Sequence, residues 1–432
     1  MTAEQNFSVR NMFKQETLSN GIQLITAHRA DTQAVTVLVL VKIGSRYEPL
    51  ELNGVSHFIE HLLFKGTAKR PTSQHLSRLL DGIGAEYNAF TGKDHTGYYV
   101  KAAAEHLLLA LDVLSDMFFN SLFDEKEMNK ERGVIMEEIN MYSDNPLMLI
   151  GDIFETAIYD GHPLGRKISG PKAVIQKVSR ASLVKFYKDY YYRNRIIIGV
   201  AGNFDQSAIK KSVTSYFGNK KVQAKTRPFK KFSINQKSPR VNLHYKETEQ
   251  VQLALGFPSF KNTDPRAYSL SLLAVILGGN MSSRLFTEIR EKRGLAYFVK
   301  AGSESYEDTG SLIIQAGLEL NSVPKAITTI LAELKKVVSQ GVTVAELGRA
   351  KEFLKGKFVL QLEDSANLIG WIAEQKLLTG KIATPQQKLK KIMAVTLADV
   401  KAVAAQVMDF SKTNLALIGP FKDKEKFIKL LH

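Results

Sequence analysis

The chain has 432 residues, more than a single hydrophobic core normally holds, so we expect at least two domains. Its hydrophobic content of 44% and charged content of 24% are ordinary for a globular protein. It contains no cysteine, which excludes disulfides, thiolate metal sites and a cysteine nucleophile. Any metal must therefore be held by histidine or carboxylate side chains.

The net charge of +16 raises the question of nucleic-acid binding. The basic residues are dispersed apart from two local clusters, 220–231 and 422–429, and no known nucleic-acid-binding motif accompanies them. We interpret the charge as a solvated surface, with attraction of acidic peptides or an anionic membrane surface as the weaker alternative. No apolar stretch approaches the roughly 20 residues of a membrane span, and the first residues lack a secretory signal. We therefore expect a cytoplasmic protein with no nucleic-acid or membrane partner.

Residue periodicity in the first half predicts strands separated by helices. The predicted strands are 13–18, 22–27, 34–43, 86–91, 96–103 and 196–201. The predicted helices are 54–64, one that follows 71–73 and ends at residue 82, 105–119, a long helix from 124 toward 142, and a helical region over 172–190. Asp124 with Glu127 three residues later resembles a capping box at the start of the long helix.

The second half repeats this order of elements. Its predicted strands are 251–256, 298–305, 311–318 and 414–418, and its predicted helices are 267–277, 283–293, 324–340 and 343–360. The segments 194–204 and 413–421 both run from an apolar strand through glycine to phenylalanine, and a helix is expected after each. We predict an α+β fold of two similar, duplicated domains, each a mainly antiparallel sheet covered by helices. The domains are 1–217 and 238–432, joined by an aperiodic linker, 218–237.

One predicted helix carries His57, Glu60 and His61. Positions i, i+3 and i+4 share a helical face, so both imidazoles and the carboxylate point the same way. Two neutral histidines can occupy adjacent corners of a tetrahedral zinc site, and a carboxylate beside them can take the proton of a metal-bound water. The order H-x-x-E-H is the reverse of the commoner H-E-x-x-H. Two surface histidines are the alternative, but the apolar residues around the motif would make unpaired polar groups costly.

A third metal ligand is expected on the long helix, where Glu131, Glu137 and Glu138 are the candidates. Glu131 and Glu138 are seven residues apart and share a face, whereas Glu137 is turned by about 100°. One glutamate on the metal and a second that supports the site therefore fits Glu131 with Glu138 better than any pair that includes Glu137. Zn²⁺ is the expected metal, and Mn²⁺ or Co²⁺ would suit the same ligands.

Five segments form a specific combination: 57–67 (HFIEHLLFKGT), 84–91 (GAEYNAFT), 131–138 (ERGVIMEE), 164–171 (LGRKISGP) and 277–285 (LGGNMSSRL). In these segments the chain resembles the pitrilysin–insulinase family of zinc metallopeptidases, which includes insulin-degrading enzyme and the β subunit of the mitochondrial processing peptidase. The resemblance runs from about residue 18 to residue 421. The length is similar to that of the small, single-module branch.

By position, the resemblance implies that His57, His61 and Glu138 hold one zinc ion per chain. Glu60 is then the general base that activates a zinc-bound water, and Glu131 is the supporting carboxylate.

Two further parts of the sequence resemble substrate-binding elements of the family. Arg290 and Tyr297 resemble an arginine–tyrosine pair that contacts the substrate backbone or the tetrahedral intermediate. Asn88, Ala89 and Phe90 resemble the edge strand on which a peptide substrate is added as an extra β-strand.

The resemblance implies a zinc endopeptidase or oligopeptidase that hydrolyses extended or unfolded peptides inside a chamber. The alternative is a non-catalytic structural or partner subunit, which the family also contains. Such members usually lose the H-x-x-E-H residues or the arginine–tyrosine pair, and this chain keeps both. Because the chain resembles half of the doubled enzymes, we expect a homodimer whose subunits face each other.

Overall fold

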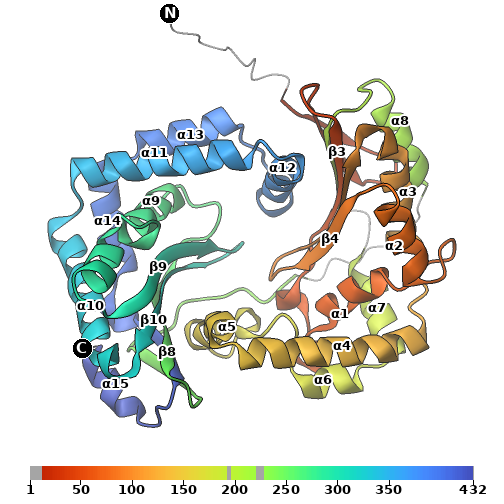
Figure 1. The fold of residues 1–432 in the computed structure, drawn as a ribbon. Helices are drawn as coiled ribbons and strands as arrows, with labels where there is room; N and C mark the ends of the chain where they lie inside the picture. Colours follow the sequence, from red (N-terminus) through yellow and green to blue (C-terminus); the bar gives the residue numbers. More distant parts are fainter. Residues whose placement is uncertain (1–11, 192–195, 220–227, 432) are drawn as a thin grey trace, which may run out of the picture. The chain divides into compact units, whose positions relative to one another are not determined.

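The computed structural model describes residues 12–191, 196–219 and 228–431. The chain forms two compact units, and Figure 1 labels their helices and strands. The first unit comprises residues 1–137, 167–229 and 359–385, and the second comprises 138–166, 230–358 and 386–432. Within the described ranges, no helix is both long enough and apolar enough to span a membrane.

The first unit contains a six-stranded sheet in the order β1-β2-β6-β3-β5-β4. Its strands are β1 (Lys14–Thr17), β2 (Gln23–His28), β3 (Ala34–Val41), β4 (Glu86–Thr91), β5 (Thr96–Ala103) and β6 (Ile196–Gly202). β2 and β6 run parallel, and the other neighbouring pairs run antiparallel. β4 therefore forms one edge of the sheet, and β1, which carries only polar residues, forms the other.

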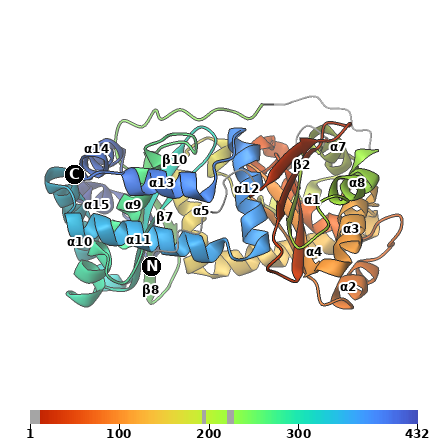
Figure 2. The same cartoon turned by 90° about the horizontal axis from the view of Figure 1, so that it is seen from above.

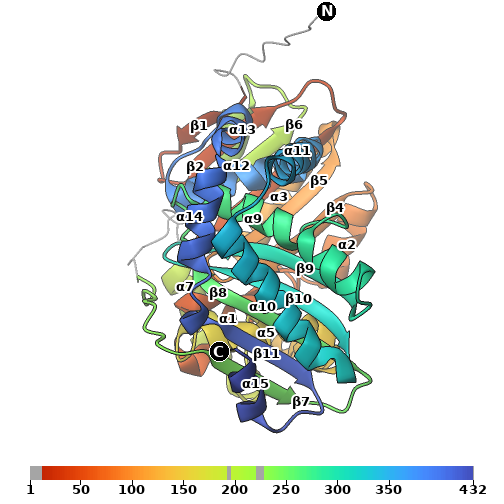
Figure 3. The same ribbon diagram turned by 90° about the vertical axis from the view of Figure 1, so that its left-hand side faces the viewer.

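The second unit contains a five-stranded sheet in the order β7-β11-β8-β10-β9, which Figure 3 shows strand by strand. Its strands are β7 (Arg240–Tyr245), β8 (Gln250–Ser259), β9 (Ala296–Ser305), β10 (Gly310–Glu319) and β11 (Asn414–Gly419). β7 and β11 run parallel, and the remaining pairs run antiparallel. Apart from β1, the two sheets have the same strand order and the same strand directions. The predicted α+β fold with duplicated, mainly antiparallel sheets is thereby confirmed.

Helices cover both sheets. Those of the first unit are α1 (Val55–Leu63), α2 (Ser73–Asp81), α3 (Leu107–Asn120), most of α4 (Glu125–Asp144), α6 (Lys172–Lys177), α7 (Arg180–Tyr190), α8 (Ile209–Val213) and α12 (Ser365–Thr379). Those of the second are α5 (Pro146–Ile158), α9 (Ala267–Gly278), α10 (Val323–Gln340), most of α11 (Val344–Gln361), α13 (Pro385–Ala394), α14 (Leu397–Val407) and α15 (Lys424–Leu430). The division between the units falls within the continuous helix α4, between Glu137 and Glu138.

One helix of each unit comes from the other half of the chain. α12 packs on β2, β3 and β6, and it is drawn beside β3 in Figure 1 and beside β2 in Figure 2. α5 packs on the corresponding strands β7, β8 and β11. A glycine allows the close approach in each case: a Cβ on Gly199 would lie 2.4 Å from Ile369 of α12, and one on Gly256 would lie 2.8 Å from Phe154 of α5. The compact units are therefore discontinuous along the chain, whereas the predicted division treats each half as continuous.

Most predicted elements lie within a few residues of observed ones, and the differences have local causes. The helical region predicted over 172–190 is two helices, because Ser179 caps α7 and separates it from α6. The helix predicted over 283–293 reduces to a π-helical segment, Phe286–Glu291. Asp124 caps α4 by accepting from two backbone amides, and the side chain of Glu127 pairs with Lys130. The helices expected after residues 204 and 421 are α8 and α15. No helix was predicted at α5 or α12–α14, nor a strand at β7. Of the predicted linker, 220–227 lies outside the described residues.

Candidate metal centre

Helix α1 presents one apolar and one polar side. Phe58, Ile59, Leu62 and Leu63 are at most 1% exposed and pack into the core. Glu60 and His61 are half-buried on the other side, together with His57 one turn earlier. The core contacts therefore fix the rotation of the helix and the direction of its polar side chains.

The N-terminus of α1 is held from outside the helix. The buried carboxylate of Glu48 accepts hydrogen bonds from the backbone amides of Gly54 (2.7 Å) and Ser56 (2.8 Å) and from the side chain of Asn53 (2.9 Å). Burial raises the pKa of Glu48, and these donors oppose the rise. Gly170, with a φ of 72°, packs on the same turn, where a Cβ would lie 2.2 Å from the carbonyl oxygen of Asn53. This contact explains why glycine is needed in the segment 164–171.

The side chain of Arg132 on helix α4 packs against α1. The guanidinium of Arg132 lies 5.6 Å from the ring centroid of Phe58 and donates to the carbonyl oxygens of Ile175 and Val178. These contacts connect α4, α1 and the α6–α7 region through one residue. The position of α4 against α1 is therefore determined by packing and by hydrogen bonds.

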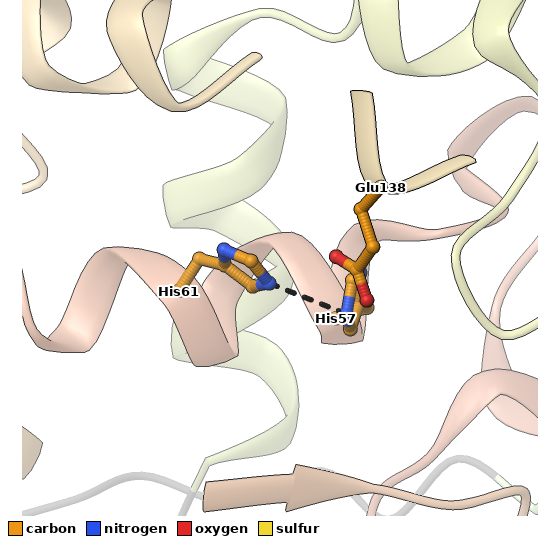
Figure 4. Close-up of side chains that lie close together, drawn as sticks. All are labelled: His57, His61 and Glu138. Carbon is orange, nitrogen blue, oxygen red and sulfur yellow. Dashed lines mark hydrogen bonds between the residues drawn. The ribbon is translucent and has the colours of Figure 1, made fainter. Parts of the chain in front are cut away.

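His57 and His61 of α1 and Glu138 of α4 come together, as Figure 4 shows. One ligand atom from each lies within 4.8 Å of the other two, and the two histidine Nε2 atoms are 3.3 Å apart. Two nitrogens bound to one tetrahedral zinc at 2.0–2.1 Å would be separated by about 3.3–3.4 Å. The residues therefore fit a metal of this kind. Among the described residues, this is the one group of three such side chains found close enough to hold an ion.

Glu131 orients His61. Its Oε1 lies 2.8 Å from His61 Nδ1, and its Oε2 accepts from Lys65 Nζ at 2.7 Å. Burial raises the pKa of Glu131, but the hydrogen bonds from His61 and Lys65 outweigh burial and leave this pKa below its ordinary value. An ionised carboxylate can only accept, so His61 donates through Nδ1 and presents the lone pair of Nε2 to the cluster.

The two remaining glutamates of the prediction have different surroundings. Glu60 Oε2 accepts a hydrogen bond of 2.5 Å from the Thr91 hydroxyl on β4. Glu137 is exposed on α4 and is not part of the three-residue group. Helical phase favoured Glu138 over Glu137, and in the structure Glu138 is the one of the two that lies beside the histidines.

Strand β4 carries the residues predicted to bind a substrate strand. It is paired with β5 only and forms the edge of the first sheet. Asn88 and Phe90 are exposed, whereas Ala89 is half-buried on the opposite face. The ring of Phe90 covers Gly97 of β5 and meets His95 edge-on at 5.7 Å. One side of the β4 backbone is thus not engaged by another described strand.

Arg290 and Tyr297 lie in the second unit, where they contact each other. The Arg290 guanidinium is 5.7 Å from the Tyr297 ring centroid and 5.0 Å from that of Phe286. Tyr297 is 74% exposed, so its phenol is largely presented to solvent at the start of β9. The two residues predicted as a pair therefore form one in the structure.

Sequence reasoning missed three residues of the site. Lys65 stands four residues after His61, and this helical spacing could have indicated a shared partner. Thr91 stands two residues after Ala89, so the period of a strand could have placed it on the same face. Glu48 offers no such signal, because it caps a helix that begins several residues later.

The fold and the side-chain group together define a duplicated α+β protein with an H-x-x-E-H helix and, beside its two histidines, a glutamate from a second helix. In sequence, the family described as insulinase (Peptidase family M16) matches residues 23–172, and the peptidase M16 inactive domain matches residues 177–354. The chain belongs to the insulinase family, peptidase family M16. The family resemblance seen in the five sequence segments is thereby confirmed.

Relatives and solved structures match over almost the whole chain. The uncharacterized zinc protease YmxG of Bacillus subtilis is 39% identical over 412 residues, which cover 95% of this chain and 98% of that protein. The uncharacterized zinc protease SCO5738 of Streptomyces coelicolor is 36% identical over 423 residues, covering 95% and 90% respectively. The crystal structure of a protease from Helicobacter pylori has the same fold, with a TM-score of 0.88 and 24% identity over 94% of this chain and 99% of that chain.

Proposed function

We propose that the chain is a zinc-dependent endopeptidase or oligopeptidase that hydrolyses extended or unfolded peptides. The observation that carries this proposal is the group of His57, His61 and Glu138, with two imidazole nitrogens at the separation that tetrahedral zinc requires. The names of the relatives, which are zinc proteases, give it further support.

We assign one zinc ion per chain to His57, His61 and Glu138. When bound, zinc polarises a peptide carbonyl and lowers the pKa of water. Glu131 keeps His61 in the tautomer whose Nε2 faces the ion, and Lys65 balances the charge of Glu131. These two residues act on the site without touching the ion.

Glu60 is assigned as the proton acceptor. It stands on the same side of α1 as the two histidines, and as a carboxylate it takes a proton from the attacking water and delivers it to the leaving amine. The edge of β4 then aligns an extended peptide through backbone hydrogen bonds, which suits substrates of varied sequence. Arg290 and Tyr297 supply a cation and a phenol for the substrate backbone or the developing oxyanion.

The proposal is tested by zinc content and by cleavage of an unstructured peptide. The wild type should bind zinc and cleave, and Glu60→Gln should retain zinc while kcat falls about 10²- to 10⁴-fold. Glu138→Gln should lose zinc, whereas Glu137→Gln, changed one residue away, should keep both zinc and activity. An undiminished rate in Glu60→Gln would contradict the mechanism. A wild type that neither holds zinc nor cleaves would favour the alternative, a non-catalytic partner subunit.

We further propose that two chains form a homodimer whose subunits face each other around a chamber. The support is the length of the chain, which resembles that of half a doubled enzyme of the family. Light scattering at micromolar concentration should give twice the mass of 48.2 kDa. A monomer at that concentration would contradict the homodimer but not the zinc site.

A further inference from the structure

Thr91, the last residue of β4, carries a hydroxyl that donates to Glu60 Oε2 at 2.5 Å. We infer that Thr91 is a positioning residue that holds the Glu60 carboxylate in the orientation needed to accept a proton. This inference rests on the proposed function, in which Glu60 is the proton acceptor. It assigns a role in the reaction to a strand that otherwise has only a substrate-binding one.

The direction of the Thr91 side chain follows from strand geometry. Side chains of β4 alternate, so Tyr87, Ala89 and Thr91 are half-buried while the residues between them are exposed. The half-buried face packs on α1, where the ring of Tyr87 also meets Phe64. The hydroxyl of Thr91 therefore points at the helix that carries Glu60.

The backbone beside Thr91 is anchored on both sides of the turn that follows. Gly92 donates to the His95 carbonyl at 2.8 Å, and its own carbonyl accepts from the backbone amide of Ser45 at 3.1 Å. Two residues further on, Asp94 forms a 2.8 Å ion pair with the fully buried Arg46. A hydroxyl on so constrained a backbone is held in place before substrate binds, which is what precise alignment of a base requires.

A glutamate has three rotatable side-chain bonds, so its carboxylate needs a partner to stay in one orientation. A hydrogen bond to one oxygen restricts the positions that the carboxylate takes and so helps to direct the other oxygen. In a half-buried place such a bond to a charged group is stronger than in water. Loss of the hydroxyl should therefore lower the rate of proton transfer without changing how zinc or peptide binds.

The test compares Thr91→Val, which keeps the shape of the side chain, with Thr91→Ser, which keeps the hydroxyl. Thr91→Val should lower kcat about 10- to 100-fold, the effect of one hydrogen bond to a charged group. KM, zinc content by elemental analysis and the thermal unfolding midpoint should stay near wild type, and Thr91→Ser should restore most of kcat. Thr96→Val is the matched control, because Thr96 pairs with Thr91 across the ladder but donates to the Ile43 carbonyl. It should leave kcat unchanged.

A double-mutant cycle with Glu60→Gln separates this role from a general structural one. In the Glu60→Gln background, Thr91→Val should cause no further loss of the residual rate, because the two residues act as a unit. Equal losses in both backgrounds, a loss of zinc in Thr91→Val, or no rescue by Thr91→Ser would each overturn the inference. If Thr91→Val fails to fold, Thr91→Ala replaces it in the same cycle.

The wild type separates this inference from the proposed function. An active wild type whose Thr91→Val variant keeps full kcat would overturn the role of Thr91 alone. A wild type that binds zinc but cleaves no peptide would overturn the proposed function and the role of Thr91 with it.

Discussion

Glutamine in place of Glu131 should weaken zinc binding about 10- to 150-fold. The carboxylate of Glu131 accepts from two donors, His61 at Oε1 and Lys65 at Oε2, and the residue is only 4% exposed. A glutamine offers one accepting oxygen and one donating amide, so one of the two donors must face an amide group whichever way the side chain is placed.

The expected size follows from the hydrogen bond that is lost. A hydrogen bond to a charged group contributes about 1.5–3 kcal/mol, and each 1.4 kcal/mol corresponds to a factor of ten in affinity. If the amide faces His61, the imidazole must turn or change tautomer before Nε2 can bind the ion. If it faces Lys65, the ammonium loses its carboxylate partner and the adjoining turn loosens.

The assay is a competition titration of zinc against a chelator, with Glu137→Gln as the control on the same helix. Glu137 is exposed and outside the ligand group, so its variant should bind zinc as the wild type does. Zinc affinity within twofold of wild type in Glu131→Gln would refute the reasoning. In that case Glu131 would serve the packing of α4 and α1 and not the orientation of His61.

The remaining predictions concern stability. Gly170→Ala should destabilise the fold by more than about 2 kcal/mol in urea unfolding, because the new methyl would collide with the turn before α1. Gly161→Ala is the control: its φ of 67° is similar, but a Cβ there would meet nothing within 4 Å, so it should cost only about 1 kcal/mol. Equal losses of stability in the two variants would contradict the predicted collision. Hydrogen bonding to Arg284 lowers the pKa of Glu346 in the folded protein to about 2. The ion pair therefore stabilises the fold fully above the pKa of the unfolded chain, near 4.5, and this stabilisation is lost as the pH falls from there to about 2. Glu346→Gln should accordingly lose about 1–2 kcal/mol at pH 7, after allowance for solvent screening, and nearly nothing at pH 2, and a pH-independent loss would argue against the ion pair. Removal of zinc with a chelator should lower the unfolding temperature, and adding zinc back should restore it, because a ligand that binds only the folded state stabilises that state. An unfolding temperature that does not change would count against the assigned ligands.

The sequence predicts those parts of the fold and site whose conformation depends on residues only a few positions apart. The hairpin of β4 and β5 has the predicted bounds, because alternation and a glycine turn determine it locally. The shared face of Glu131 and Glu138 follows from helical phase alone, and the contact of Glu131 with His61 agrees with it.

What the sequence does not predict depends on segments that are distant along the chain. Helix α12 buries Ile369 and other apolar side chains, but nothing in its own residues indicates that Ile369 packs beside Gly199 of the first sheet. The hydrogen bond from Thr91 to Glu60 joins a strand to a helix 31 positions away. Such contacts are selected by the packing of whole elements and leave no period in the sequence.

The placement of α12 has a consequence for how the protein is made. Its first residue, Ser365, shares a 2.8 Å hydrogen bond with Thr36 of β3, a separation of 329 positions. While the chain leaves the ribosome, one face of the first sheet stays uncovered until more than four-fifths of the protein has been synthesised. Completion of the first unit is thus delayed to a late stage of synthesis, and contacts this remote in sequence slow folding. A nascent chain that stops before α12 would expose an apolar sheet face, a natural target for chaperones.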